Sequence, residues 1–179
     1  SGSKPFKTAI SNVRVLFRVY TPASRFQQSF LVVSKSFADK HGVKTFSDIV
    51  QKKLPIRIAI NRRGNMDADV GEEAMTLLGA SRNNIKSWGG QVVHAASKEI
   101  VSLMSDRRID VANFGISYNH PRVREIAKNS SPVLLSYGSD VASKVAKKFG
   151  GEVCKVKPGE YKWSANSAIS VCMGAVVVV

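Results

Sequence analysis

The chain has 179 residues, 44% of them hydrophobic and 22% charged, which is typical of a folded globular protein and excludes an intrinsically disordered one. Its 27 Lys and Arg against 13 Asp and Glu give a net charge of +14, which attracts anionic partners. The basic residues form scattered pairs with no Cys/His finger and no aromatic RNA-binding run, so the sequence disfavours nucleic acid as a partner. No run approaches the ~20 apolar residues that cross a bilayer. Cys154 and Cys172 are compatible with a disulfide or with two buried thiols.

Strand and helix patterns alternate along the chain. In chain order, they predict strands at 13–20 and 30–34, a short helix at 45–53, a strand at 56–60, a helix that Gly79 closes, a strand at 91–95, a helix at 97–107, a strand at 109–114, a helix at 121–129, a strand at 132–136, a helix at 139–149, and short strands at 153–156 and 168–171 before a final valine run. Such alternation predicts an α/β fold with a mostly parallel sheet and helices on both faces.

The segment 56–80 carries the strongest functional signal, because an apolar strand runs through Asn61-Arg-Arg-Gly-Asn-Met-Asp67 into a helix. A strand that enters a helix through a glycine turn aims unpaired backbone N–H groups and the positive end of the helix dipole at one point. Asp67 or Asp69 is expected to cap the first turn. The helix that begins at Pro121 offers a second set of N–H groups. Two helix N-termini on one sheet edge favour a small anion such as a carboxylate.

Ligands of such sheets bind beyond the carboxyl ends of the strands, which selects the loops 61–67, 115–120 and 137–139, with the segment 158–161 as an aromatic wall. Each residue concerned can equally be a plain turn or packing residue. The candidate ligand-binding residues are Asn61, Gly64, Asn65, Met66, Ser117, Tyr118 and Tyr161.

Signatures of cofactors, metals and catalysis are missing from the sequence. It contains neither Gly-x-Gly-x-x-Gly nor a Gly-Lys-Ser/Thr phosphate loop, so no nucleotide cofactor is expected. His41, His94 and His120 stand far apart without a carboxylate or cysteine at ligand spacing, so no metal site is expected. Ser117 near His120 is the local Ser–His pair of interest, and no third residue orients it, which argues against an enzyme.

Short motifs follow one another in a definite order. They are Val19-Tyr20, Phe30-Leu-Val-Val33, Ser47-Asp48-Ile49, Ile58-Ala-Ile60, Gly64-Asn-Met-Asp67, Leu77-Leu-Gly79, Arg107-Arg-Ile-Asp-Val111, Ser117-Tyr-Asn-His-Pro121 and Lys157-Pro-Gly-Glu-Tyr161. This order resembles that of the TAXI family of solute receptors, the extracytoplasmic binding proteins of TRAP-type transporters, and more broadly of type 2 periplasmic binding proteins. Asn65-Met66-Asp67 stands where the family has Ser-Gly-Thr, which adds a carboxylate beside the expected ligand, and Ser117 stands where it has a glycine.

The resemblance implies a fragment of a periplasmic or otherwise extracytoplasmic receptor. Such a receptor hands a small organic anion, an amino acid or a dicarboxylate, to the permease subunits of a membrane transporter, without a cofactor and without chemical change. The implied parts are crossing strands that lead into the lobe over 1–54, an α/β ligand-binding lobe over 55–165, and a truncated returning hinge strand over 166–179. Most of an N-terminal lobe would be lacking, so weak binding is expected. The alternative is the effector-binding domain of a LysR-like transcription regulator, which shares this architecture.

Overall fold

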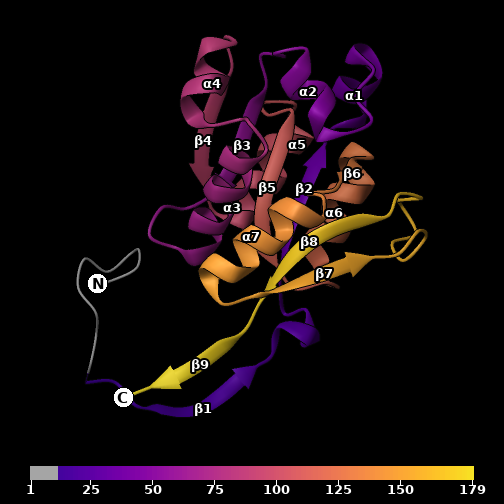
Figure 1. Ribbon diagram of the computed structural model, residues 1–179. Coiled ribbons are helices and arrows are strands. Elements are labelled where there is room, and N and C mark those ends of the chain that lie inside the picture. The colour runs from indigo at the N-terminus through magenta and orange to yellow at the C-terminus, as the bar shows by residue number, and fades with distance from the viewer. Residues whose placement is uncertain (1–11) are drawn as a thin grey trace.

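The computed structural model describes residues 12–179 (Figure 1). Its strands are β1 (Val15–Tyr20), β2 (Gln27–Val33), β3 (Arg57–Asn61), β4 (Gln91–Ala95), β5 (Val111–Ile116), β6 (Val133–Leu135), β7 (Glu152–Val156), β8 (Ala168–Met173) and β9 (Ala175–Val178). Its helices are α1 (Lys35–His41), α2 (Phe46–Gln51), α3 (Met66–Leu77), α4 (Arg82–Ser87), α5 (Ser97–Ser105), α6 (Pro121–Ser130) and α7 (Ser139–Phe149), and a 3₁₀ turn, η1, spans Pro22–Ser24. The α1 and α4 helices have no counterpart among the predicted elements, because 7 and 6 residues are too few to show an apolar period.

Within the described residues, one mixed sheet contains the strands in the order β4-β3-β5-β2-β8-β7, and β6 also pairs with β2. The strands β3, β4, β5, β6 and β8 run in one direction, and β2 and β7 run against them. Because β2 lies between β5 and the strands β6 and β8, the parallel pairings of residues 12–179 are confined to β3–β4 and β3–β5. The α/β class is confirmed, and the expected mostly parallel sheet is corrected to a mixed one. Strand periodicity alone carries no information on the direction of a neighbouring strand.

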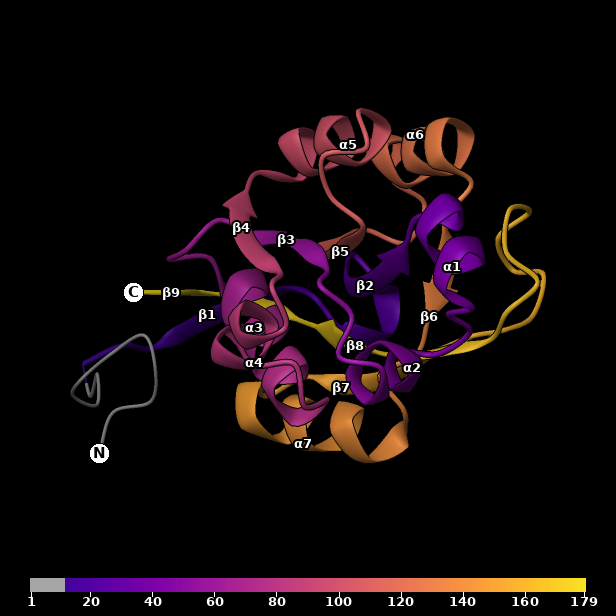
Figure 2. The same cartoon turned by 90° about the horizontal axis from the view of Figure 1, so that it is seen from above.

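The central strands are buried on both faces. Successive side chains of a strand point to opposite faces, so Leu31 and Val33 join the apolar cluster under α1, α2, α3, α4 and α7, while Phe30 and Val32 join the cluster under α5 and α6. Figure 2 shows α5 and α6 on one side of the sheet and α3, α4 and α7 on the other. Helices therefore cover both faces, as predicted. None of the helices between residues 12 and 179 is long and apolar enough to span a membrane.

A disulfide joins Cys154 on β7 to Cys172 on β8, which decides between the two alternatives that the sequence left open. The two strands are antiparallel neighbours, with Glu152 opposite Cys172 and Val156 opposite Ala168. The bridge therefore fastens the edge strand β7 to the interior of the sheet.

The strands β1 and β9 form a separate antiparallel ribbon that leaves the α/β body (Figure 1). The ribbon joins the body at two places, because β1 leads into β2 through η1 and β8 continues into β9 past Gly174. β2 itself is a central strand of the sheet, although it belongs to the segment expected to lead into the lobe. The division at residues 54 and 165 stays a prediction. Large apolar side chains of the ribbon are exposed, namely Val15, Leu16, Phe17, Val19, Val176 and Val178.

Candidate functional site

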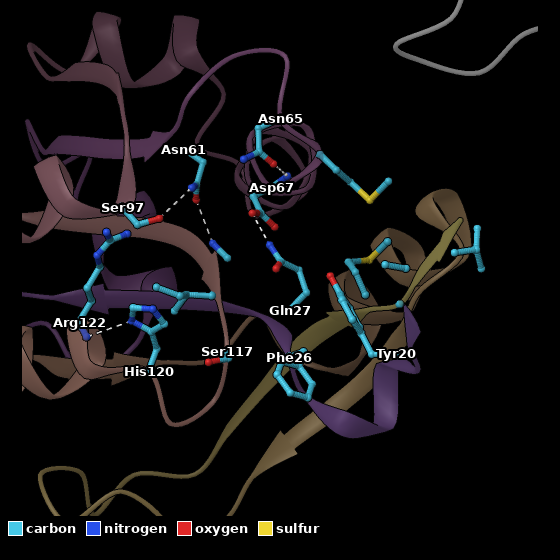
Figure 3. A pocket seen from close by; sticks show the side chains of 17 residues that line it. Tyr20, Phe26, Gln27, Asn61, Asn65, Asp67, Ser97, Ser117, His120 and Arg122 are labelled. Carbon is cyan, nitrogen blue, oxygen red and sulfur yellow. Dashed lines mark hydrogen bonds between the residues drawn. The ribbon is translucent and has the colours of Figure 1, made fainter. Parts of the chain in front are cut away.

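A pocket of about 880 Å³ lies at the sheet edge where β3 and β5 end and the β1–β9 ribbon begins (Figure 3). The parallel strands β3, β4 and β5 end at the same edge, so the loops that follow them all reach this pocket. The other wall comes from the start of β2 and from the ribbon. The lining residues are Tyr20, Phe26, Gln27, Asn61, Asn65, Met66, Asp67, Ser97, Gly115, Ile116, Ser117, His120, Arg122, Met173, Gly174, Ala175 and Val176.

Three helices begin at this pocket. Asn65 caps α3, Ser97 is the first residue of α5 and His120 caps α6, and each of the three lines the pocket. The first N–H groups of a helix have no partner within the helix, and the helix dipole adds a partial positive charge there. The expected gathering of helix N-termini at one sheet edge is therefore found, and α5 adds a third N-terminus to the two that were predicted. The expected set of N–H groups after Pro121 is not free, because His120 accepts hydrogen bonds from the N–H groups of Arg122 and Val123.

Asn61 connects the ends of the three parallel strands. Its side-chain oxygen accepts a hydrogen bond from the backbone N–H of Gly115 at 2.9 Å, and its amide nitrogen donates to Ser97 Oγ at 3.3 Å. The backbone carbonyl of Asn61 accepts a hydrogen bond from His94 Nδ1 on β4 at 2.8 Å. With 3% of its surface exposed, Asn61 holds the pocket floor together as well as lining it.

Asp67 places a buried carboxylate at the start of α3. Its Oδ2 accepts a hydrogen bond from the Gln27 amide nitrogen on β2, and its Oδ1 lies against Gly115, where a Cβ atom would be 2.1 Å away. Burial raises the pKa of Asp67 above its ordinary value, and the hydrogen bond from Gln27 offsets part of that rise. The backbone N–H of Asp67 donates to the Asn65 side chain at 3.0 Å. The expected cap by Asp67 or Asp69 is thus wrong, because α3 begins at Met66 and Asn65 takes the capping position.

The α6 side of the pocket carries positive charge. His120 Nδ1 accepts a hydrogen bond from the backbone N–H of Arg122 at 3.2 Å, which requires that this nitrogen be unprotonated. Burial lowers the pKa of His120, and the charges of Arg122 and Arg124 lower it further, so the imidazole is neutral near pH 7. The guanidinium of Arg122 is therefore the cation among the pocket-lining side chains that the structure describes.

Four of the candidate ligand-binding residues come together in this pocket: Asn61, Asn65 and Met66 from the first loop and Ser117 from the second. Gly64 is a turn residue with a φ of 80° and does not line the pocket. The third expected loop, 137–139, does not reach it. Tyr137 is buried, and its hydroxyl donates to Asn113 Oδ1 at 2.8 Å. Burial raises the pKa of that hydroxyl to about 12.

Tyr118 and Tyr161 do not line the pocket. Tyr161 is packed against Phe30 and Trp163, and its hydroxyl donates to the backbone carbonyl of Tyr118 at 3.0 Å. The Tyr118 ring lies beneath Arg25, whose Cζ is 3.9 Å from the ring centroid. Tyr161 and Arg25 therefore hold Tyr118 of the 115–120 loop in place.

Five polar lining residues were not among the candidates, namely Gln27, Asp67, Ser97, His120 and Arg122. A signal for His120 and Arg122 was present, because they flank the proline that opens a predicted helix. No local signal marks Gln27. It reaches the pocket because β2 runs antiparallel to β5, which brings Gln28 opposite Ile116.

Neither a metal-ligand cluster nor an oriented Ser117–His120 pair is found among residues 12–179. No group of three or more His, Cys, Asp and Glu side chains between residues 12 and 179 could hold a metal ion. Ser117 and His120 are connected through the backbone, where the His120 N–H donates to the Ser117 carbonyl at 3.1 Å. Because His120 Nδ1 accepts the Arg122 N–H, the neutral ring carries its proton on Nε2, so neither ring nitrogen can accept a proton from Ser117 and the pair is not arranged as a nucleophile and its base.

A scan against models of known protein families finds no match, and a search of curated proteins finds no significant match. Among solved structures, the chain is similar to PhnD1 from Prochlorococcus marinus (MIT 9301) in complex with methylphosphonate. The TM-score is 0.48 and the identity is 11%, over 78% of this chain and 57% of that one. It is also similar to a binding protein component of an ABC phosphonate transporter from Pseudomonas aeruginosa. There the TM-score is 0.41 and the identity is 8%, over 93% of this chain and 42% of that one.

The chain thus spans about half the length of these two structures, by the coverage of 57% and 42%. Likeness at this level does not extend to ligand or activity. No family model places the chain among TAXI receptors, so that resemblance stays a prediction.

Proposed function

We propose that this chain is the ligand-binding lobe of an extracytoplasmic solute receptor that takes up a small organic anion and hands it to a membrane transporter. One observation carries the proposal: three helix N-termini and the Arg122 guanidinium face one pocket at the carboxyl edge of the sheet. Backbone N–H groups at helix N-termini bind carboxylate and phosphate groups without a dedicated counterion. Arg122 adds a charge-assisted hydrogen bond to the same group. At α6 the first residue is a proline and the N–H groups of Arg122 and Val123 are bonded to His120, so this helix acts through its dipole and the Arg122 side chain.

The surroundings of the pocket support a receptor that closes on its ligand. Phe26 and Met66 line the pocket although 60% and 51% of their surfaces are exposed. The β1–β9 ribbon beside them also exposes apolar side chains. Exposed apolar surface around a binding site is typical of a surface that another protein part covers. A second lobe that packs on the ribbon and contacts Phe26 and Met66 would bury this surface and enclose the ligand.

The disulfide between Cys154 and Cys172 supports an extracytoplasmic location. Disulfides persist in oxidising compartments and are rare in the cytosol. A LysR-like regulator works in the cytosol on DNA, so the disulfide favours the receptor over that alternative.

Binding of carboxylates to the whole chain tests the proposal. In ¹⁵N–¹H spectra, titration with carboxylic acids such as propanoate or L-alanine is expected to shift the amide signals of Asn65, Ser97 and Ser117, with affinities in the millimolar range. Glucose is expected to shift none of them. Tighter binding of glucose than of every carboxylate would refute the proposal.

Two arginines of α6 form a matched pair of variants. Arg122→Gln removes the pocket cation, and a carboxylate is expected to bind at least about tenfold more weakly, as when a hydrogen bond to a charged group is lost. Arg124→Gln removes the same charge from an exposed residue of α6 that does not line the pocket. Its affinity is expected to stay within about twofold of the wild type. Equal losses in both variants would show that bulk charge, and not this pocket, attracts the anion.

A further inference from the structure

A buried carboxylate such as that of Asp67 is unexpected in a pocket that binds a simple anion, because the two negative charges repel each other. Asp67 is 7% exposed, it lines the pocket, and no ion pair of residues 12–179 includes it. The hydrogen bond from Gln27 is its one side-chain partner in this part of the chain, and Gln27 is neutral. A buried carboxylate without a cation is costly, and the raised pKa of Asp67 reflects that cost.

The hydrogen bond to Gln27 does not by itself account for a charge at this position. An asparagine would hold the same glutamine with a neutral hydrogen bond and without the cost of burying a carboxylate. Gly115 leaves room for the Asp67 oxygens, because a side chain there would collide with them. The pocket therefore keeps a carboxylate at a place where a packed neutral group would be more stable, which is typical of a binding or catalytic group.

The charges of the pocket lie at two separate places (Figure 3). Asp67 and Gln27 form one group beside α3, and Arg122 and His120 form the other at the start of α6. Gln27 donates with its amide nitrogen to Asp67, which leaves its amide oxygen as a further acceptor on that side. One side of the pocket thus offers acceptors for a cation, and the other offers donors for an anion.

We propose that the ligand carries an ammonium group as well as a carboxylate, as an α-amino acid does, and that Asp67 receives the ammonium while the Arg122 guanidinium receives the carboxylate. This inference rests on the proposed function and narrows its ligand class. A dicarboxylate, in contrast, would bring a second negative charge close to Asp67, and like charges at about 4 Å repel each other even in a well-solvated site. An ammonium offers three donors and matches the two Asp67 oxygens and the Gln27 amide oxygen.

Matched pairs of ligands test the inference on the whole chain. Each pair differs by one amino group: L-alanine with propanoate, L-leucine with 4-methylpentanoate, L-phenylalanine with 3-phenylpropanoate, and L-glutamate with glutarate. In the same spectra, at least one amino acid is expected to bind about tenfold or more tightly than its partner. If the deaminated acids bind as tightly as the amino acids or more tightly, the inference is overturned and the proposed function stands. If no carboxylate binds at all, the proposed function fails together with the inference.

The variant Asp67→Asn keeps the shape of the side chain and removes its charge. The preference for the amino acid over its deaminated partner is expected to disappear in this variant, with thermal unfolding showing that the protein is folded. Asp69→Asn is the control, because Asp69 lies in the same first turn of α3 and does not line the pocket. The preference is expected to persist there. A folded Asp67→Asn protein that keeps the preference would show that the ammonium binds elsewhere, and would overturn the inference.

Discussion

The side-chain oxygen of Asn61 accepts a hydrogen bond from the backbone N–H of Gly115 at 2.9 Å, which fastens the end of β3 to the end of β5 beyond their last ladder pair, Ile60 with Asn113. Asn61→Ala would leave this buried N–H group without a partner. We expect the free energy of unfolding to fall by about 1–3 kcal/mol in urea titrations. Gln91→Ala, an exposed position on β4, is expected to change it by less than about 0.5 kcal/mol. An unchanged midpoint for Asn61→Ala would contradict this role.

A glycine is required at position 115 because of the neighbouring Asp67 side chain, and not because of the backbone conformation. Gly115 has no positive φ, but an added Cβ would lie 2.1 Å from Asp67 Oδ1. Gly115→Ala is therefore expected to lower the free energy of unfolding by about 1–3 kcal/mol. In the double variant Gly115→Ala/Asp67→Ala the carboxylate is gone, so the alanine at 115 is expected to cost less there than in the wild-type background. If the losses of unfolding free energy in the two single variants add up to the loss in the double variant, the residues at 115 and 67 do not collide.

The Arg25–Glu160 ion pair contacts the 115–120 loop through the Tyr118 ring. Arg25 donates to Glu160 and lies over the Tyr118 ring, and Glu160 also accepts a hydrogen bond from the Lys157 N–H at 2.7 Å. Burial raises the pKa of Glu160, but the hydrogen bonds from Lys157 and Arg25 outweigh it and hold the pKa below the ordinary 4.5. A carboxyl whose pKa is lowered in the folded state adds stability above its unfolded pKa and loses it as the pH falls through the folded value.

Glu160→Gln is accordingly expected to lower the free energy of unfolding by about 1 kcal/mol at pH 7. The difference from the wild type is expected to shrink as urea titrations are repeated at pH values below 4.5, the ordinary pKa of the group. The control is Asp140→Asn, because the Asp140–Lys144 pair on α7 is well exposed and is expected to contribute little at any pH. If the loss of unfolding free energy in Glu160→Gln does not depend on pH, lost packing and not lost charge is its cause.

The Cys154–Cys172 bridge closes a loop with a sequence separation of 18 residues. A cross-link over a loop of that length restricts the unfolded chain, and its loss is expected to cost about 3 kcal/mol. Urea titrations with and without dithiothreitol measure this cost, and intact-mass analysis after alkylation of free thiols shows whether the bridge is present. The double variant Cys154→Ser/Cys172→Ser is expected to have the same free energy of unfolding as the reduced protein. Dithiothreitol is expected not to change that value. Alkylation of both cysteines in the untreated protein would refute the bridge.

Local patterns in the sequence determine the helices and strands well where the signals lie within a few residues. The helix predicted at 139–149 coincides with α7, Ser139–Phe149, because apolar residues recur along one face and Gly150 ends the helix in the left-handed region. The strand predicted at 91–95 coincides with β4, Gln91–Ala95. The positions of two helix N-termini at the pocket also follow from local order, because a strand followed by a turn and a cap aims the helix at the strand's carboxyl end.

The contents of the site depend on contacts that no local pattern encodes. Tyr161 was expected to form an aromatic wall of the ligand site. It belongs to the core instead, because its ring packs against Phe30 and Trp163. Gln27 and Asp67 meet across α3 and β2, 40 residues apart in the chain.

The sequence by itself therefore determined the α/β class, the order of the elements other than α1 and α4, and two of the helix N-termini at the pocket, since these depend on propensity, caps and apolar period over a few residues. Only the tertiary structure decided that β2 runs against β5 in the middle of the sheet, that Cys154 meets Cys172, and that a carboxylate and a guanidinium share one pocket. The physical reason is that strand pairing and side-chain burial are set by which surfaces fit together across the whole chain, and distant residues leave no periodic trace of that fit.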